Sequence, residues 1–423
     1  MWRWVTLSCL ICFLSLRCFT QDLGNVTIYN TDNSELIYNQ INSLEFDAQN
    51  RLWIGTPDGL SVLDDGENWF NFNNSTTPWC YLPTNVITAL EWADNLSMMF
   101  IGTSAGITDY WDAGDLMDDE GPAGAWCPAF GSSCSPNTGI ITSLLYADGI
   151  WAGSTDGLCV QYLGGEGNWL LENTESGFYS NNITSIKQNP NNDMIAIGTM
   201  NGGLVTYDND FSIYYTSNSD ILDNTVFDVA FDQNNNTIIC TPQAGLGILT
   251  ENGSWIWLNT LNSTLPTNSL KNVVVDNNNN LWIATLEDGL AHYTNNTFYN
   301  YTVENSNLPD NNINCLLFGP NNHLWLGTEN SGVVKINTPI ITLPELASEN
   351  IHIYPTIFKS HINIEVPEDV RIKIFNHQGQ LINNYTLLAG GHKIDTYNYD
   401  SGVYFMVLKS DNYKKTCKLI KRY

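Results

Sequence analysis

The hydrophobic positions of the chain fall into short segments of about five residues, separated by turns rich in Gly and Asn. The segment at residues 51–60, RLWIGTPDGL, returns in altered form at residues 280–290 and 323–333. Aliphatic and aromatic side chains dominate these segments, and polar residues bound them, as in antiparallel strands. The pattern therefore predicts an all-β protein built from a repeated unit.

Alignment on the recurring Gly-Thr pair gives seven copies of this unit, spaced by 47, 51, 45, 42, 44 and 43 residues. Each copy predicts four strands: an apolar strand led by Asn, the Leu-Trp-Ile-Gly-Thr strand, a strand after a Gly turn, and an aromatic strand. One such unit cannot cover its own apolar faces, so neighbouring units must stack. Seven stacked units predict a seven-bladed β-propeller. The first residues of the seven pairs are Gly55, Gly102, Gly153, Gly198, Cys240, Ala284 and Gly327.

The two ends of the repeat predict how the ring closes. The seventh unit has no fourth strand after residues 332–337, GVVKIN. An orphan strand, VTIYN at residues 26–30, precedes the first unit and is followed by the loop sequence that elsewhere follows a fourth strand. Pairing this strand with the last unit would hide two sheet edges that otherwise invite aggregation.

The unit Asn-x-Ile-x-x-Leu, followed by Leu-Trp-Ile-Gly-Thr-x-x-Gly-Leu, resembles the two-component-regulator propeller repeat over residues 25–340. The resemblance implies a periplasmic ligand sensor, which in that family is usually followed by a membrane helix and a histidine kinase. This sequence shows neither segment, so a sensing role would require a separate membrane partner.

The remaining segments predict an exported protein with two folded parts. Residues 1–20 combine Arg3 with an apolar run too short to span a membrane comfortably, which is typical of a signal peptide cleaved between Thr20 and Gln21. We expect the propeller over residues 21–342, a linker over 343–350 and a small C-terminal β-sandwich over 351–423. No later segment is apolar for long enough to span a bilayer, so no membrane span is expected in the mature chain.

The C-terminal strands resemble the sorting domain of the type IX (Por) secretion system of Bacteroidetes. The resemblance implies interaction with that secretion machinery, removal of the tail, and a protein secreted or held at the outer-membrane surface of a Gram-negative bacterium. A plain carbohydrate-binding sandwich is the alternative. The residues that carry the match are Tyr354, Pro355, Gly379, Gly402, Tyr404, Lys418 and Lys421.

Charge separates the same two parts. The formal net charge is −28, yet ten Lys and Arg residues lie beyond position 345. Between Thr20 and Glu345 the basic residues are Arg51, Lys187, Lys271 and Lys335. So acidic a propeller is not expected to bind nucleic acid.

Several recurring residues predict packing or turns. Trp53, Trp151, Trp282 and Trp325 share one repeat position, which indicates core packing between units. The Asn that starts each unit, with Gly139 in the third, predicts a left-handed backbone conformation, which both residue types tolerate. Cys159, Cys240 and Cys315 lie in apolar strand patterns and are expected to be buried thiols.

The second unit interrupts the period and supplies the candidate binding residues. Long connections at residues 73–85 and 109–137 place aromatic and cysteine residues in expected loops, where function in repeat proteins concentrates. The aromatic side chains could stack on a glycan or grip a protein; alternatively the loops pack on themselves, with a disulfide of unknown pairing. The aromatic candidates are Trp79, Tyr81, Trp111 and Trp126, and the cysteine candidates are Cys80, Cys127 and Cys134.

No catalytic residue, metal site or cofactor is predicted. The propeller has two histidines and one arginine, the acidic residues at 112–120 lack EF-hand spacing, and no nucleophile constellation is visible. We therefore interpret the protein as a surface binding module for a glycan or protein. An enzyme acting on extracellular polysaccharide, or a ligand sensor, remains open. A close carboxylate pair with raised pKa values in the central cleft would favour the enzyme.

Overall fold

The computed structural model describes residues 23–74, 82–111, 125–127, 139–162, 170–337, 352–354, 357–366, 369–376, 380–409 and 414–422. The chain divides into two compact units, Met1–Pro339 and Ile340–Tyr423. Every regular element in the described ranges is a strand, and none of those ranges contains a helix that could cross a membrane.

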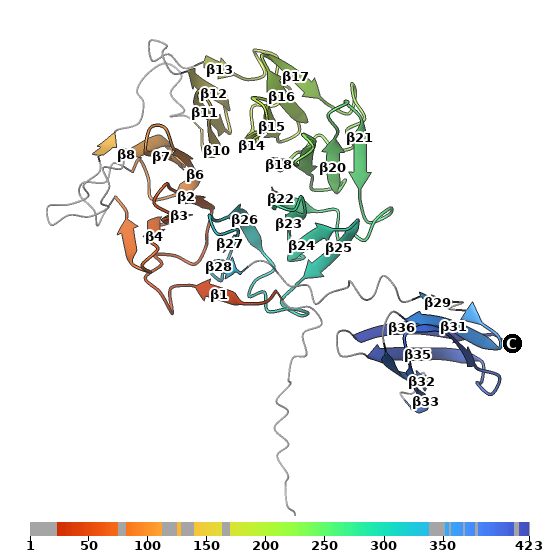
Figure 1. Ribbon diagram of the computed structural model, residues 1–423. Coiled ribbons are helices and arrows are strands. Elements are labelled where there is room, and N and C mark those ends of the chain that lie inside the picture. The colour runs from red at the N-terminus through yellow and green to blue at the C-terminus, as the bar shows by residue number, and fades with distance from the viewer. Residues whose placement is uncertain are drawn as a thin grey trace, which may run out of the picture. The chain divides into compact units, whose positions relative to one another are not determined.

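The first unit is a β-propeller of seven four-stranded antiparallel sheets arranged in a ring (Figure 1). Blade 1 consists of β2 (Ser43–Phe46), β3 (Leu52–Thr56), β4 (Gly59–Leu63) and β5 (Trp69–Phe72). Blade 2 consists of β6 (Ile87–Ala93), β7 (Met98–Thr103), β8 (Gly106–Trp111) and β9 (Ala125–Cys127). Blade 3 consists of β10 (Ile141–Tyr146), β11 (Gly149–Ser154), β12 (Gly157–Tyr162) and β13 (Leu170–Glu172). Blade 4 consists of β14 (Ile183–Gln188), β15 (Ile195–Thr199), β16 (Leu204–Asp208) and β17 (Asp210–Tyr214). Blade 5 consists of β18 (Asp228–Phe231), β19 (Thr237–Cys240), β20 (Leu246–Leu249) and β21 (Trp255–Leu258). Blade 6 consists of β22 (Leu270–Val275), β23 (Leu281–Thr285), β24 (Leu290–Thr294) and β25 (Thr297–Tyr301). The predicted all-β propeller is confirmed.

Blade 7 closes the ring with a strand from the opposite end of the unit. Its sheet contains β26 (Ile313–Phe318), β27 (Leu324–Thr328), β28 (Val333–Ile336) and then β1 (Val26–Tyr29). The register runs from Val26 opposite Ile336 to Tyr29 opposite Val333. The predicted closure by the N-terminal strand is therefore present, and it is held by hydrogen bonds and packing.

The two residues of the recurring Gly-Thr pair recur for different physical reasons. A Cβ at Gly55 would lie 2.8 Å from Ile87 of the next blade, so glycine permits close approach of neighbouring sheets. The Thr56 hydroxyl donates to the Gly59 carbonyl at 2.8 Å and ties the turn between β3 and β4. The same hydroxyl-to-glycine bond recurs at Thr103, Ser154, Thr199, Thr241, Thr285 and Thr328.

The Asn at the start of each unit has another role than predicted. Its backbone does not adopt positive φ in any of the six copies. Instead, the side-chain oxygen accepts a hydrogen bond from the preceding loop; Asn39 accepts from the Thr31 amide at 2.9 Å. The left-handed prediction is wrong because these asparagines fix the loop by accepting a backbone amide. The others are Asn85, Asn181, Asn224, Asn268 and Asn311.

The recurring tryptophans pack between blades as predicted, since Trp53, Trp151, Trp282 and Trp325 are all buried. Cys159 and Cys240 are buried, whereas Cys315 is only half-buried. The second blade also corrects an expectation, because it keeps a short fourth strand, β9. Trp111 ends β8, and Trp126 and Cys127 lie in β9, so these three residues are in strands and not in loops.

The second unit packs a three-stranded sheet against a five-stranded sheet. The strands are β29 (His352–Tyr354), β31 (His361–Val366) and β34 (Gly390–Asp395) in the first sheet, and β30 (Ile357–Phe358), β36 (Lys414–Lys421), β35 (Gly402–Lys409), β32 (Val370–Asn376) and β33 (Leu381–Leu387) in the second. Alternating side chains of both sheets, such as Ile362, Ile372 and Met406, form one buried core. This is the predicted C-terminal β-sandwich.

Candidate functional site

The innermost strands of the seven blades surround a central channel with a cavity of about 340 Å³. These strands are β2, β6, β10, β14, β18, β22 and β26. Their inner edges have no neighbouring strand, so the outward N–H and C=O groups need other partners. The channel wall must therefore be polar, although each of these strands also packs apolar side chains between blades.

Side chains of one blade satisfy the backbone edge of the next. The Asn42 amide donates to the Ile87 carbonyl at 2.7 Å, and the Thr142 hydroxyl donates to the Ile183 carbonyl at 2.6 Å. Equivalent bonds join Thr184 to the Val226 carbonyl and Asn314 to the Ile41 carbonyl. We call this set the inter-blade girdle; it explains most of the Asn and Thr residues of the channel as structural.

Acidic side chains take part in the girdle as acceptors. Buried Asp228 accepts from the Ser185 hydroxyl at 2.6 Å and from the Val273 amide at 2.9 Å. Glu91 accepts from the Tyr146 amide of the next blade at 2.9 Å. Both carboxylates thus replace a missing strand neighbour, which is a structural use of charge.

Four polar groups in the channel wall are not used in this way. Lys187 is exposed and makes no hydrogen bond or ion pair with any described residue. Among the described residues, Glu45 accepts a hydrogen bond from the amide of its neighbour Phe46 alone, at 3.0 Å. The hydroxyl oxygens of Ser43 and Thr88 are buried and have no partner among the described residues. Lys187 of blade 4 and Glu45 of blade 1 are therefore available to a ligand, whereas the two buried hydroxyls are not.

The strand register places three charged side chains at one level of the channel. Glu45 lies opposite Trp53, and Glu91 lies opposite Phe100. Lys187 lies opposite Ala196. Each of these partners stands two residues before the Gly of the recurring pair, so the three charges occupy equivalent positions in blades 1, 2 and 4.

This arrangement raises the pKa of both glutamates. Burial in the channel wall is the largest cause for Glu45, and the like charge of Glu91 adds to it, while Lys187 acts in the opposite direction. Burial also raises the pKa of Glu91, against the effects of Lys187 and of the Tyr146 amide. The raised pKa values bring the titration of both carboxyls close to neutral pH, which suits proton transfer or hydroxyl binding.

A second polar group lies at the strand starts, toward one end of the channel. The Lys271 ammonium donates to the Asn314 side chain at 2.6 Å, and that amide in turn donates to Glu329 at 2.8 Å. Burial lowers the pKa of Lys271. The chain of bonds leaves Lys271 engaged, in contrast to Lys187.

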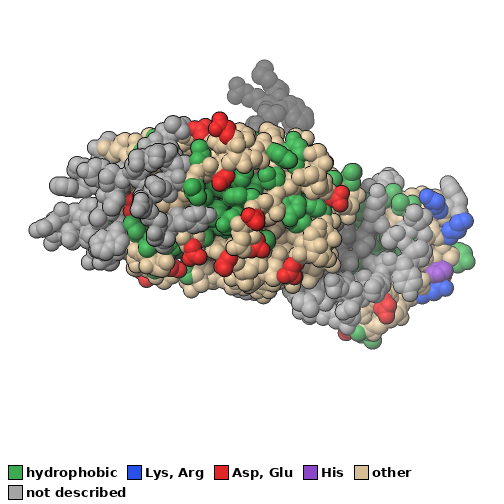
Figure 2. Space-filling model, turned by 90° about the horizontal axis from the view of Figure 1, so that it is seen from above, with side chains coloured by type: hydrophobic (Ala, Val, Ile, Leu, Met, Phe, Trp, Pro, Cys, Tyr) green, Lys and Arg blue, Asp and Glu red, His purple; other side chains and the backbone are tan. Residues whose placement is uncertain are grey.

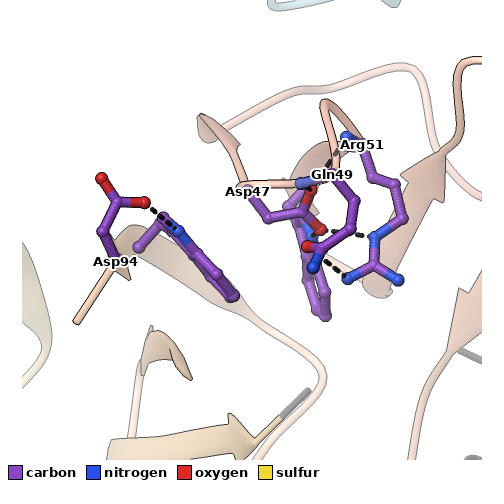
Figure 3. A network of polar contacts seen from close by, with 6 residues as sticks. Asp47, Gln49, Arg51 and Asp94 are labelled. Atoms are coloured by element: carbon purple, nitrogen blue, oxygen red, sulfur yellow. Dashed lines mark hydrogen bonds and ion pairs between the residues drawn. The ribbon is translucent and has the colours of Figure 1, made fainter. Parts of the chain in front are cut away.

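The single arginine of the propeller is not available to a ligand. Arg51 pairs with Asp47 at 2.5 Å in the turn between β2 and β3, and Gln49 accepts a further bond from its guanidinium (Figure 3). The indole of Trp53 donates to the same Asp47 carboxylate at 2.7 Å. All three propeller lysines, by contrast, line a channel or cleft. The side of the propeller seen in Figure 2 presents acidic and hydrophobic side chains, and no Lys or Arg side chain of a described residue is visible on that side.

None of the candidate residues predicted from sequence is among the described residues that line the channel. Trp79, Tyr81, Cys80 and Cys134 lie outside the described residues, as do Thr20 and Gln21. For Trp111, Trp126 and Cys127 only the strand positions are described. No group of three His, Cys, Asp or Glu residues in the described ranges is placed to hold a metal ion.

The sorting residues are partly described. Tyr404 is buried and donates to the Asp400 carbonyl at 2.8 Å, and Gly402 begins β35. Lys421 donates to the carbonyls of Lys359 and Thr396 and lies over the Phe358 ring. Tyr354 lies in β29 and Lys418 in β36, and Pro355 and Gly379 are outside the described residues.

Two families match the chain. Residues 352–422 match the secretion system C-terminal sorting domain, and residues 35–58 and 307–330 match the two component regulator propeller. The chain is thus a propeller of the two-component-regulator type joined to a type IX sorting domain. The sorting domain marks it as a secreted or cell-surface protein of the Bacteroidetes kind and implies interaction with secretion machinery. No curated protein matches the sequence.

Solved structures share the fold at low sequence identity. A structure described as the extracellular domain of a hybrid two component system from B. thetaiotaomicron is 18% identical, with a TM-score of 0.64; the match covers 94% of this chain and 57% of that one. PorZ, a surface component of the type-IX secretion system of Porphyromonas gingivalis, is 15% identical, with a TM-score of 0.53, and the match covers 92% of this chain and 60% of PorZ. The chain therefore spans less than two thirds of either structure.

Sequence reasoning missed the channel charges. A weak signal was present at one position of the first strand, directly after its central aliphatic residue. Two units have leucine there, Leu145 and Leu317, whereas three others have a charged residue, Glu45, Glu91 or Lys187. A charged residue at a position that is apolar in sister repeats is a sign of a site, and the seven-fold alignment would have revealed it.

Proposed function

We propose that this protein is an extracellular binding module that holds a hydroxyl-rich ligand, such as the end of a glycan, in its central channel. The supporting observation is a pair of charged side chains in the channel wall that the girdle does not use, the Lys187 ammonium and the Glu45 carboxyl. The girdle accounts for most other polar side chains there, so these two are left to meet a ligand.

The chemistry of the two groups suits sugar hydroxyls. Lys187 donates, and the Glu45 carboxyl accepts when it is ionised and both donates and accepts when it is protonated. A sugar hydroxyl can accept from one group and donate to another at once. One carboxyl opposite one ammonium does not favour a strongly charged ligand, and the absence of an available arginine does not favour phosphate or sulfate.

A screen on a glycan array tests this function. Wild-type protein should bind at least one glycan, and the double variant Glu45→Gln, Lys187→Met should lose that binding by about 10-fold or more. The double variant Trp79→Ala, Trp126→Ala is the matched comparison, because it tests the aromatic candidates. Binding lost only in the tryptophan variant would move the site to those residues; no binding by the wild type would turn attention to a protein ligand or a membrane partner.

An extracellular polysaccharide-degrading enzyme is the second candidate, and the raised pKa values of Glu45 and Glu91 favour it. A protonated and an ionised carboxyl side by side can serve as acid and base in glycosidic bond cleavage. Reducing-end release from a polysaccharide panel, lowered about 100-fold in both Glu45→Gln and Glu91→Gln, would support catalysis. Binding without any release would leave the binding module.

A further inference from the structure

Two clefts between neighbouring blades are equivalent in position but differ in their side chains. One lies between blades 4 and 5 and has a volume of about 310 Å³; the other lies between blades 7 and 1, at the ring closure, and has a volume of about 190 Å³. We call them the 4/5 cleft and the closure cleft. Tyr214 in the first cleft corresponds to Tyr29 in the second. Each tyrosine lies on the outermost strand of its blade, opposite the residue that follows the Gly of the turn between the second and third strands.

The closure cleft has an aromatic wall, which the 4/5 cleft lacks. Trp325 stacks on Tyr29 with ring centroids 6.2 Å apart, and Phe46 meets the same indole edge-on at 5.8 Å. The position of Trp325 is held by Ala196 in blade 4. Tyr29 and Phe46 are half-buried, so part of each ring faces the cavity.

A glycine leaves an indole donor open in this cleft. In blade 1 the turn residue Asp47 accepts the Trp53 indole N–H at 2.7 Å. Blade 7 has Gly319 at the turn position of Asp47, and a Cβ there would lie 2.8 Å from Nε1 of Trp325. No described residue accepts the Trp325 N–H, so this donor is available in the cavity wall.

Three further kinds of polar group line the closure cleft without a hydrogen-bond partner among the described residues. The Lys335 ammonium lies 5.1 Å from the Trp325 ring and makes no ion pair with a described residue. Nδ1 of His323 is buried and has no hydrogen-bond partner. Asp65 and Glu67 are exposed carboxylates at the rim. Donors, acceptors and an apolar ring face are thus presented together.

We propose that the closure cleft is a second ligand site, which takes a single uncharged pyranose ring of a glycan. The volume is smaller than that of a site for a drug-sized ligand and suits one ring. The apolar face of a pyranose can lie against Tyr29 and Phe46, while its hydroxyls meet Lys335, the Trp325 N–H and the rim carboxylates. Three carboxylates, Asp64, Asp65 and Glu67, line the cleft against the one ammonium of Lys335, which disfavours an anionic sugar. This site is independent of the channel and of any ligand bound there.

Saturation-transfer NMR on the full chain tests the proposal with four probes: the methyl pyranosides of glucose, galactose, mannose and N-acetylglucosamine. We expect at least one to bind at about 20 mM or below, and its affinity to fall about 10-fold in Gly319→Asp and in Lys335→Met. The new aspartate should accept the Trp325 N–H, as Asp47 does for Trp53. Lys335→Met keeps an apolar stem on the indole, so it remains informative if Gly319→Asp does not fold.

Two controls make the outcome decisive. Glu251→Gln changes the 4/5 cleft at the position of Asp65 and should leave pyranoside binding unchanged, and so should the channel variant Glu45→Gln, Lys187→Met. Absence of saturation transfer for all four probes would overturn the proposal. Equal affinity in the wild type and in Lys335→Met would also overturn it. Loss in the channel variant alone would assign the pyranoside to the channel and reject the closure cleft.

Discussion

The 4/5 cleft and the closure cleft are formed by equivalent backbone segments, yet the side chains at equivalent positions differ. In the 4/5 cleft the third-strand residue is Thr206, and the second-strand residue opposite it is Ala196. In the closure cleft the same positions hold Lys335 and Trp325. Blades 4 and 5 are joined by continuous chain, whereas blades 7 and 1 are joined through β1, which hydrogen bonds and packing must hold in place. The difference shows that, at the closure, the contacts of Trp325 with Tyr29 and Phe46 add to the hydrogen bonds that hold β1 in place.

The largest effect should come from removing the aromatic centre of the closure cleft. Trp325→Ala makes this position like Ala196 and should lower the free energy of unfolding by about 4 kcal/mol, because a buried tryptophan leaves a large cavity. Urea denaturation measures the loss. A loss below about 1 kcal/mol would mean that the closure does not depend on these contacts.

The equivalent pair of positions in blade 6 extends the comparison to the pH dependence of stability. His292 occupies the position of Lys335, and its ring stacks on Trp282 with centroids 3.7 Å apart. Burial lowers the pKa of His292 to about 4, whereas an unfolded histidine keeps a value near 6.5. Its contribution to stability is present above pH 6.5 and is lost as pH falls toward 4, because the unfolded chain then binds the extra proton.

His292→Phe should therefore reduce the acid sensitivity of the protein. Between pH 7 and pH 4 the wild type should lose about 3 kcal/mol more than the variant, measured as the difference in urea stability at each pH. Parallel stability curves for the two proteins would show that His292 is protonated in the folded state without cost.

A smaller difference should separate the two tyrosines. Tyr29 contacts both Trp69 and Trp325, and Tyr214 contacts Trp255 only. Aromatic pairs contribute about 1 kcal/mol each, so Tyr29→Ala should cost about 1 kcal/mol more than Tyr214→Ala. Thermal and urea unfolding of both variants measure this. Equal losses would remove the energetic distinction between the clefts.

The smallest effect should follow changes at the rims. Asp65→Asn and Glu251→Gln alter exposed carboxylates, and each should change the free energy of unfolding by less than about 0.5 kcal/mol. Only Asp65→Asn should weaken pyranoside binding. A stability loss above about 1 kcal/mol in Asp65→Asn would assign that carboxylate a structural role in the closure.

The fold was predictable because seven in-phase copies report the same packing requirement. Gly55 and its counterparts permit blade approach, the Trp53 position fills the core, and the orphan strand at residues 26–30 had only one sheet to complete. The reason for the recurring Asn was not predictable from residue type, since Asn tolerates left-handed backbone and also accepts backbone amides. Only the position of the preceding loop decides between the two.

The candidate site was less predictable. Glu45, Glu91 and Lys187 are separated by tens of residues, and each stands alone in its own unit. The strand register brings them to one level, which requires knowing that the first strand of each unit is innermost. Trp111 and Trp126 drew attention because they interrupt the period, although both lie in strands of an ordinary blade.

Hydrogen–deuterium exchange with a glycan from the array tests the channel proposal most directly. We predict slower exchange on ligand addition in β2 and β6, which carry Glu45, Ser43 and Thr88, and in β14, which carries Lys187, with little change in the outer strands β5, β9 and β17. Protection confined to residues 75–81 and 112–138, with unchanged exchange in the three inner strands, would contradict the channel as the binding site.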